Sequence, residues 1–496
     1  MNAFDSAIGS SEPTEKASLA SGVGSREARA AAGGRRPISM PLALGVMACG
    51  LICFEAAYYS AGRSATLGCL IAGWPISLAQ LARLATARRA FYAGLATGFL
   101  AVAPQLECFW RIFGAAAIPL WLVLAFWIAT FAGLSQAMLA RLGAKWTALL
   151  LPFLWTGLEY FRSELYPLRF AWMNAGYALS GPPFSPLFHW LGVYGVGFVA
   201  AAIAGLVLAR RALPAMAVGA CLLGLPPIAG LFAKAPSDGH AIRIAGVQME
   251  FPAEQELRPM LERLVKLHPE AELLVLSEYT LDGPVPESLK QWCKARGRYL
   301  IVGGKLPSTN GNYFNTAFVI GPEGKIVFAQ GKRVPIQFFK DGLPAREQAL
   351  WESPWGKIGI CICYDLSYTR VTDRLVELGA QLLVVPTMDT EDWGAREHVL
   401  HSLVAPVRAA EYGLPIFRVA SSGISQAVER DGRVTAEAPY PGEGRALFAT
   451  MKLPERGSVP PGRALGPVSL LATVLCLGIG VFKKAPRSEA GDSGKP

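Results

Sequence analysis

Three residues in the second half of the chain have types and positions suited to nucleophilic catalysis. Cys363 ends an apolar run in GKIGICICYDLSYTR, and α/β folds present reactive groups at such strand ends, beside the turn into a helix. Glu278 directly follows the apolar run LLVLS, where burial would raise its pKa and suit it to act as a general base. Lys332 lies in AQGKRVPIQFFKDGLPA, whose proline and phenylalanines predict an ordered loop. The sequence thus predicts a cysteine nucleophile, a carboxylate base and an ordered lysine.

Each of these residues also has a plainer interpretation. Most buried cysteines are inert, and strand alternation puts Cys361 on the same face as Cys363, so that only the position at the strand exit separates them. Glu278 could be a solvated turn residue. Lys332 could be an exposed lysine, with two cationic neighbours as competitors, Arg333 and Lys340.

The elements that must position these residues lie between 235 and 460, where short β-branched runs alternate with helical patterns. Near-continuous apolar strands separated by helices indicate an α/β domain with a buried sheet, and about 220 residues suffice for one core. The expected strands are 242–248, 273–277, 299–304, 315–320, 357–363, 381–386 and 415–421. The expected helices are 254–267, 286–296, 371–378 and 395–412.

The rest of the chain has the composition of a membrane protein. The 496 residues are 52% hydrophobic and only 17% charged, and the mean hydropathy is +0.33. A span needs about 20 apolar residues. We predict eight spans, at 41–59, 65–85, 90–109, 115–138, 146–161, 188–209, 214–233 and 465–482.

The charges predict how these spans are oriented. Lysine and arginine outnumber aspartate and glutamate by 47 to 37, giving a net charge of +10. Basic residues gather in alternate loops and in both tails, which places these on the cytoplasmic side and segment 235–460 on the other side. Orientation explains the charge, so no nucleic-acid partner is expected. The basic loop and C-terminal tail residues are Arg83, Arg88, Arg89, Arg141, Lys145, Arg210, Arg211, Lys483, Lys484, Arg487 and Lys495.

Five segments follow from these patterns. They are a disordered basic tail (1–40), a seven-helix membrane domain (41–234), the α/β domain (235–460), a C-terminal transmembrane helix (461–484) and a cytoplasmic tail (485–496). The nine cysteines form no CxxC pair, which argues against a disulfide scaffold or a zinc site. No cofactor or metal is expected.

The order glutamate, lysine, cysteine matches that of nitrilase-type hydrolase domains, and the membrane part adds a more specific likeness. Residues 155–205 resemble the bacterial apolipoprotein N-acyltransferase family. The matching residues are Trp155, Glu159, Arg162, Trp172, Gly176, Tyr177 and 192–196, with Ala171 in place of the family's proline. The resemblance implies an α-helical membrane bundle of about eight spans joined to a nitrilase-like α-β-β-α sandwich.

The resemblance also implies an activity. A phospholipid would donate an acyl chain to Cys363, and the thioester would pass it to the N-terminal amine of a diacylglyceryl-cysteine on an apolipoprotein. Glu278 would be the base, and Lys332 with a backbone N–H would hold the oxyanion. Tyr364 and Asp365 are expected to support the site. The family further implies a monomer in the bacterial inner membrane, with the catalytic domain on its periplasmic side.

Two departures from the family pattern leave alternatives open. The loop after Lys332 is shorter and lacks a second glutamate, for which Asp341 or Glu347 could substitute, and Asp365 stands where the family commonly has glutamate. The alternatives are a membrane-tethered amidase, an acyltransferase for another amine, a non-catalytic binding module and a transporter. Three apolar residues could guide lipid chains to the site: Phe338, Phe339 and Trp393.

Overall fold

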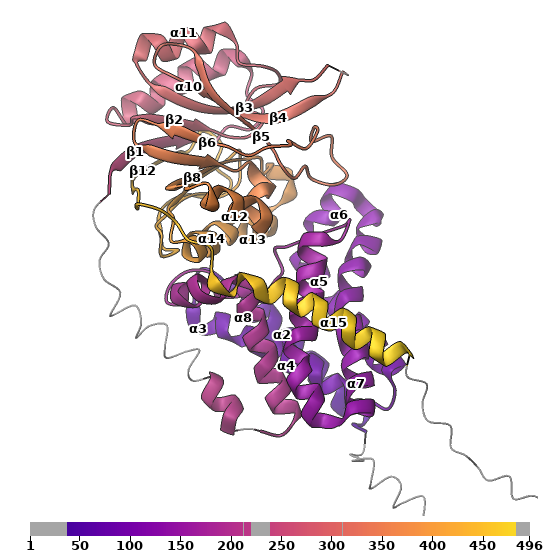
Figure 1. The fold of residues 1–496 in the computed structure, drawn as a ribbon. Coiled ribbons are helices and arrows are strands. Elements are labelled where there is room, and N and C mark those ends of the chain that lie inside the picture. Colours follow the sequence, from indigo (N-terminus) through magenta and orange to yellow (C-terminus); the bar gives the residue numbers. More distant parts are fainter. Residues whose placement is uncertain (1–36, 212, 220–238, 310, 483–496) are drawn as a thin grey trace, which may run out of the picture.

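The computed structural model describes residues 37–211, 213–219, 239–309 and 311–482, and combines a helical part with a two-sheet part (Figure 1). Most of the predicted tails, and most of the predicted span 214–233, lie outside the described residues. The helical part contains α2 (Met40–Ser60), α3 (Ala65–Gly68), α4 (Gly73–Leu81), α5 (Ala87–Gln105), α6 (Cys108–Phe113), α7 (Ala117–Tyr160), α8 (Ser185–Leu208) and α15 (Leu465–Phe482). Short turns η1 (Cys69–Ala72), η2 (Gly114–Ala116), η3 (Phe161–Leu165), η4 (Ala175–Leu179) and η7 (Pro461–Ala464) join them.

The described residues contain four helices long and apolar enough to cross a membrane, where eight spans were predicted. They are Met40–Ser60, Cys108–Leu165, Ser185–Leu208 and Pro461–Gly478. The prediction of eight is corrected for three reasons. The stretch 65–85 forms a run of short helices, and α5 begins with Arg88 and Arg89, which lower its hydropathy. The predicted spans 115–138 and 146–161 correspond to the two legs of α7, on either side of a break at Gly143 (φ 74°), and these legs count as one among the four.

Small residues let these helices approach closely. Such close packing is typical of helices in lipid, where the hydrophobic effect does not drive helices together. A Cβ at Gly94 of α5 would lie 2.9 Å from the Cβ of Ala132 on α7. Where α15 crosses α7, a Cβ at Gly157 would lie 2.6 Å from the carbonyl oxygen of Ser469. The C-terminal helix is therefore packed into the helical part although more than 250 residues separate it from α8.

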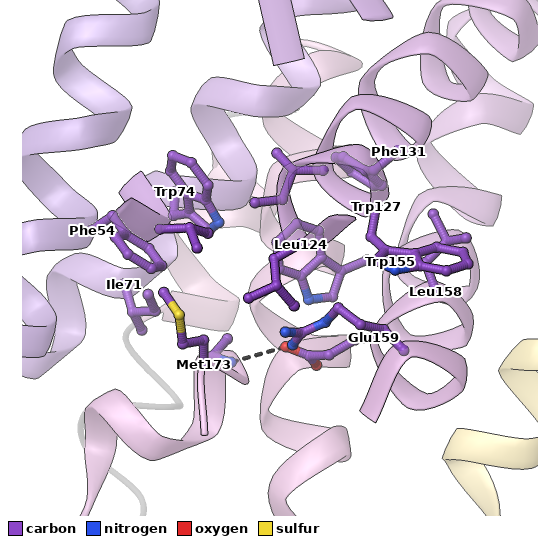
Figure 2. Close-up of a pocket in the computed structure, with 14 residues that line it drawn as sticks. Phe54, Ile71, Trp74, Leu124, Trp127, Phe131, Trp155, Leu158, Glu159 and Met173 are labelled. Carbon is purple, nitrogen blue, oxygen red and sulfur yellow. Dashed lines mark hydrogen bonds between the residues drawn. The ribbon is translucent and has the colours of Figure 1, made fainter. Parts of the chain in front are cut away.

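A pocket lies among the helices, where the space between atoms, including space open to the outside, is about 560 Å³ (Figure 2). Its wall is mostly aromatic and aliphatic, and it includes Phe54, Trp74, Trp127, Phe131 and Trp155. The carboxylate of Glu159 also lines the cavity, where it accepts a hydrogen bond from the N–H of Ala175 (2.9 Å).

The two-sheet part has six strands in each sheet. The first sheet runs β12-β1-β2-β3-β4-β5 and the second β11-β10-β9-β8-β7-β6. The strands of the first sheet are β1 (Ala241–Val247), β2 (Leu273–Leu276), β3 (Tyr299–Pro307), β4 (Tyr313–Ile320), β5 (Ile326–Gly331) and β12 (Ala446–Lys452). Those of the second are β6 (Leu350–Ser353), β7 (Gly356–Ile360), β8 (Leu382–Thr387), β9 (Ile416–Ala420), β10 (Ser425–Val428) and β11 (Val434–Ala438).

Helices cover both outer faces. Leu274 and Leu276 of β2 pack with Leu257 and Leu261 of α10 (Glu254–Leu267), while the intervening Val275 belongs to the core between the sheets. Helix α11 (Glu287–Arg296) lies beside α10, and α12 (Thr369–Glu377), α13 (Ala395–Ser402) and α14 (Val404–Tyr412) cover the second sheet (Figure 1). The predicted α-β-β-α sandwich is therefore confirmed.

All seven predicted strands are present, and five others were missed. In β11, three of five residues are exposed and the run VTAEA lacks the apolar density used to predict strands. The run IVFA of β5 is apolar, but half of the strand is exposed, and it was not predicted as a strand. The predicted helix 395–412 divides into α13 and α14 at Leu403. The predicted strand 357–363 ends earlier, at Ile360, which bears on the site.

Candidate functional site

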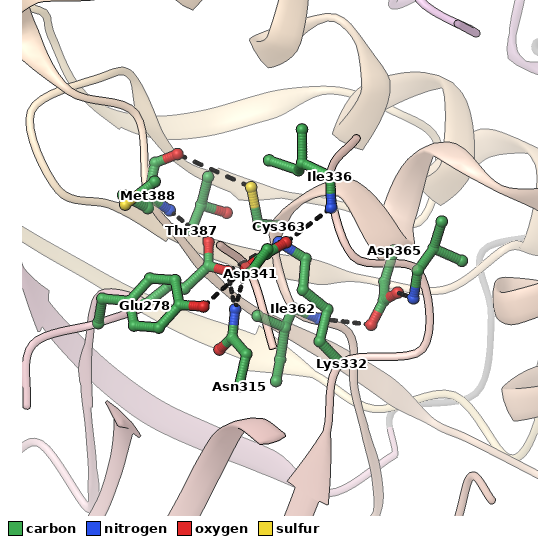
Figure 3. A network of polar contacts seen from close by, with 12 residues as sticks. Glu278, Asn315, Lys332, Ile336, Asp341, Ile362, Cys363, Asp365, Thr387 and Met388 are labelled. Atoms are coloured by element: carbon green, nitrogen blue, oxygen red, sulfur yellow. Dashed lines mark hydrogen bonds and ion pairs between the residues drawn. The ribbon is translucent and has the colours of Figure 1, made fainter. Parts of the chain in front are cut away.

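The ends of three strands bring Glu278, Lys332 and Cys363 together (Figure 3). Glu278 follows β2, Lys332 follows β5, and Cys363 begins the turn η5 (Cys363–Ser367) after β7. The ammonium of Lys332 lies 2.8 Å from Oε1 of Glu278. All three side chains are buried, with at most 2% of each residue exposed. The three predicted residues thus converge, although they come from both sheets.

Cys363 has a backbone conformation that suits a reactive position rather than a strand. Its φ of 50° lies in the left-handed region, which non-glycine residues adopt at a cost and which is frequent in active sites. Its Sγ donates to the carbonyl oxygen of Met388 (3.7 Å), and the N–H of Met388 donates to Oε2 of Glu278 (2.8 Å). One residue therefore contacts both the thiol and the predicted base.

Of the two acidic residues left open by the sequence, Asp341 lies in the site. Its Oδ2 is 2.7 Å from the ammonium of Lys332 and accepts the N–H of Ile336 (2.7 Å). Its Oδ1 accepts the hydroxyl of Tyr279 (2.8 Å). Glu347 is exposed instead. Lys332 is therefore held between two carboxylates.

Asn315 is a site residue that the sequence reasoning missed. It lies on β4, and its side-chain amide donates to Oε1 of Glu278 (2.5 Å) and to Oδ1 of Asp341 (2.8 Å). The only signal in the sequence was a polar residue at the start of the apolar run NTAFVI. The structure shows that this residue is buried. The amide fixes the two carboxylates relative to each other and to Lys332.

Burial and charge set the resting protonation of the site. Burial raises the pKa of the Glu278 carboxyl, against the opposing charge of Lys332. Burial works against the charge of Lys332, but Asp341 and Glu278 outweigh it and hold the pKa of the ammonium well above its usual value. Burial, reinforced by Glu278, raises the pKa of the Cys363 thiol well above normal. The resting thiol is therefore neutral and needs a base.

The two predicted supporting residues have different contacts. Asp365 accepts the N–H groups of Arg333 (3.0 Å) and Val334 (2.7 Å), which ties the Lys332 loop to the turn that carries Cys363. Burial raises the pKa of Asp365 to about 6, against these bonds. The hydroxyl of Tyr364 donates to the carbonyl oxygen of Arg169, in the helical part (3.2 Å).

A largely apolar cavity leads from Cys363 to the helices α6 and α7, with about 820 Å³ of unfilled space. The three residues predicted to guide lipid chains all line it, and Phe113 of α6 contacts the rings of Phe338 and Phe339 at 5.8 and 5.9 Å between centroids. Other residues that line it are Leu120, Leu124, Trp172, Tyr364 and His401. Leu124 also lines the cavity among the helices.

A more polar hollow approaches the network from elsewhere. It is lined by Tyr279, Lys305, Tyr313, Lys340, Asp341 and Met388, and it shares Ile336 and Phe339 with the apolar cavity. The catalytic candidates are thus flanked by an apolar space on one side and a polar, open space on the other.

Two groups of side chains in the described residues could offer ligands to a metal: Cys363 with Asp389 and His401, and Asp389 with Glu397 and His398. Asp389 is already paired with the guanidinium of Arg418 and with the ring of His401 (2.7 Å). A cation is therefore not required to compensate its charge.

Two family models match the chain. The carbon-nitrogen hydrolase model matches residues 193–460, and the model of the apolipoprotein N-acyltransferase N-terminal domain matches residues 41–206. The chain therefore belongs to the carbon-nitrogen hydrolase family, whose model matches more than half of its residues. Because the second model covers the helices, the chain belongs to the apolipoprotein N-acyltransferase family.

Individual proteins are similar to this chain over different shares of its length. An apolipoprotein N-acyltransferase of Azotobacter vinelandii is 28% identical over 495 residues, covering 84% of this chain and 93% of that protein. One of Shewanella oneidensis is 26% identical over 400 residues, covering 68% of this chain and 75% of that protein. A crystal structure of a carbon-nitrogen hydrolase from Helicobacter pylori G27 is 18% identical, with a TM-score of 0.38, and covers 49% of this chain and 94% of that chain.

Proposed function

We propose that this protein transfers an acyl chain from a phospholipid to the N-terminal amine of a diacylglyceryl-cysteine on an apolipoprotein, through a thioester at Cys363. The observation that carries this proposal is the placement of Cys363 between a buried glutamate–lysine network and an apolar cavity that reaches the helices. A water-soluble substrate would have no use for such a cavity, whereas an acyl chain requires one.

The first half-reaction forms the thioester. Glu278 takes the proton of the Cys363 thiol, and the thiolate attacks the ester carbonyl of the phospholipid. Lys332 and a backbone N–H stabilise the oxyanion. The C–O bond breaks, and the proton passes from Glu278 to the departing glycerol oxygen, so that a lysophospholipid leaves. Tyr364 and Asp365 support this arrangement by fixing the turn and the lysine loop.

The second half-reaction regenerates the thiol. The amine of the lipid-modified cysteine attacks the thioester carbonyl, an amide bond forms, and the C–S bond breaks. Asp341 and Asn315 keep Lys332 and Glu278 in place through both steps. No metal or cofactor takes part. Such a double displacement predicts ping-pong kinetics.

The membrane arrangement belongs to the same proposal. Besides the four long apolar helices, α5 and the short helix α4 lie in the membrane, since α5 packs along α7 and α4 packs against α2. The two-sheet part faces the periplasm from the bacterial inner membrane, with the basic loops in the cytoplasm. The protein acts as a monomer. Labelling of engineered cysteines with an impermeant reagent in intact spheroplasts tests the orientation; labelling at the predicted cytoplasmic loops would contradict it.

The activity is tested by incubating the purified protein with phospholipid vesicles and a synthetic diacylated lipopeptide, with mass spectrometry of the products. We expect a triacylated peptide, a lysophospholipid and an acyl adduct at Cys363. Cys363→Ala should lose all three products. Cys361→Ala is the matched control, because this second buried cysteine lies two residues away, outside the site network.

Other outcomes identify the alternatives. Free fatty acid without triacylated peptide would indicate a membrane-tethered amidase or esterase. An acyl adduct that passes only to another amine would indicate a different acceptor. The absence of any adduct would indicate a non-catalytic binding module. Each of these results would overturn the proposed function.

A further inference from the structure

The two half-reactions differ in the number of protons that must be moved. Thioester formation moves one proton, from the thiol to the departing alcohol, which one base can handle. The acceptor amine arrives at neutral pH largely as an ammonium, because the pKa of an α-amino group is about 7.7–8.0. Two protons must leave its nitrogen, and only one of them returns to Sγ. A second acceptor is therefore needed for the transfer step alone.

A second titratable pair lies beside the nucleophile. Nδ1 of His401, on α13, lies 2.7 Å from Oδ1 of Asp389, and Arg418 donates to the other oxygen of that carboxylate. One nitrogen of the His401 ring, one carboxylate oxygen of Asp389 and Sγ of Cys363 lie within 4.8 Å of one another. The carboxylate orients the imidazole, as in other aspartate–histidine pairs.

The position of the ring gives it access to a substrate. His401 lines the apolar cavity together with Cys363, and its ring stacks on that of Trp172, with 4.5 Å between the centroids and 20° between the planes. Because Nδ1 bonds Asp389, Nε2 is the nitrogen left to exchange a proton with a molecule in the cavity. Trp172 is itself fixed, because its indole N–H donates to the hydroxyl of Ser367 (2.9 Å).

We propose that His401, oriented by Asp389, is a second base that acts only in the transfer half-reaction, on the ammonium group of the acceptor. This inference rests on the proposed function. Nε2 takes one proton from the ammonium; the free amine attacks the thioester carbonyl; the N–C bond forms and the C–S bond breaks. The second nitrogen proton passes through Glu278 to Sγ. His401 then releases its proton to solvent, so that the transfer yields an amide, a thiol and one proton.

The charges around His401 suit this role. The groups that face it are Asp389 after β8, Arg418 on β9, Glu397 and His398 on α13, and Cys363 on η5. Burial lowers the pKa of the His401 imidazole, although the charge of Asp389 acts in the opposite direction. The imidazole is therefore neutral at neutral pH and can accept a proton.

The test is a single-turnover measurement of each half-reaction in the full-length protein, with His401→Asn. The asparagine amide keeps a donor for Asp389 and removes the base. We expect thioester formation within about twofold of wild type and transfer to the lipopeptide slowed at least about a hundredfold, the usual contribution of a general base. Raising the pH, or using an acceptor amine of low basicity, should restore much of the transfer rate.

Controls separate this role from packing. His268→Asn also removes a histidine stacked on an aromatic ring (Phe448, 4.7 Å between centroids), but on the outer face of the first sheet, and should change neither step. If His401→Asn does not fold, the wild-type transfer step must still show an additional acid limb, below about pH 6.5, beyond the Glu278 limb that it shares with thioester formation. Equal losses in both steps, or no rescue by a weakly basic amine, would overturn the inference. Absence of any thioester in wild type would instead overturn the proposed function.

Discussion

At the scale of single residues, the site depends on one cation shared by two carboxylates. Lys332 is fully buried and lies 2.8 Å from Glu278 and 2.7 Å from Asp341. Such a group has two tasks: it compensates the carboxylates at rest and is available to an oxyanion at Cys363. Its substitution should therefore affect chemistry and folding together.

Lys332→Met should slow thioester formation by about two to three orders of magnitude, the usual cost of removing an oxyanion donor. The free energy of unfolding should also fall, because two buried carboxylates lose their partner. Rapid-quench trapping of the thioester and thermal unfolding in detergent measure the two effects. Lys325→Met, which changes an exposed lysine, is the control. A variant with normal acylation would exclude Lys332 from the reaction.

The pH dependence of thioester formation should be controlled by Glu278. Burial, and also the charge of Asp341, raise the pKa of the Glu278 carboxyl. The rate should therefore fall on the acid side at a pH higher than about 4.3, the pKa of a free glutamate, because the protonated carboxyl cannot act as a base. Asp341→Asn removes the neighbouring negative charge and should move this fall to lower pH. Glu347→Gln should leave it in place. If Asp341→Asn leaves the pH dependence of thioester formation unchanged, Asp341 does not influence the pKa of Glu278.

At the scale of elements, neighbouring strands hold the base by close backbone contact. A Cβ at Gly303 of β3 would lie 2.6 Å from the Cα of Glu278 and 2.7 Å from the carbonyl oxygen of Ser277. The position next to the base is therefore restricted to glycine by space. The run YLIVGG predicted a strand here, but not that its glycine adjoins the base, since strand order is a property of the folded sheet.

Gly303→Ala should displace Glu278 and reduce the rate of thioester formation by at least about tenfold, since small shifts of a catalytic group are costly. Gly283→Ala is the matched control, because no other group lies within 4 Å of the point where its new methyl group would stand. Acylation rates and circular dichroism of both variants, compared with wild type, make the measurement. A loss in both variants would point to the loop rather than to contact with Glu278.

At the scale of the whole molecule, a buried ionic network joins the two parts. Glu411 of α14 accepts the N–H of Val193 on α8 (2.7 Å) and pairs with Arg408 and with Arg463 (3.2 Å), which lies in the turn before α15. A second contact between the helical part and the two-sheet part is made by Glu164, which accepts hydrogen bonds from the N–H and the hydroxyl of Thr369 (2.9 and 2.8 Å). These contacts hold the cavity of Cys363 against the helices.

Glu411→Gln should lower the free energy of unfolding by about 3–5 kcal/mol at neutral pH, because it leaves buried arginines uncompensated. Despite burial, Arg408 and Arg463 hold the pKa of Glu411 below its usual value. Its stabilisation is therefore present above about pH 4.3, the value in the unfolded chain, and is lost as the pH falls further. Denaturant unfolding in detergent at neutral and acidic pH should show the difference shrinking. Glu377→Gln, at an exposed site, is the control.

The sequence by itself determined the local elements and the identity of the reacting groups. Apolar runs predicted seven of the twelve strands in the described residues, and strand ends marked Glu278 and Cys363, because these signals lie within a few consecutive residues. Strand β10 is fully buried but was missed, since its run SQAV begins with two polar residues. The number of long apolar helices was overestimated, because 65–85 forms short helices, charged residues open α5, and the two legs of α7 count as one element.

Tertiary structure decided which groups meet. It selected Asp341 over Glu347, added Asn315, and placed the Asp389–His401 pair beside Cys363. It also joined the nucleophile to the helices through an apolar cavity whose walls come from both parts of the chain. These contacts link residues far apart in sequence, and they depend on strand order and on packing between layers, which no local pattern of residues encodes.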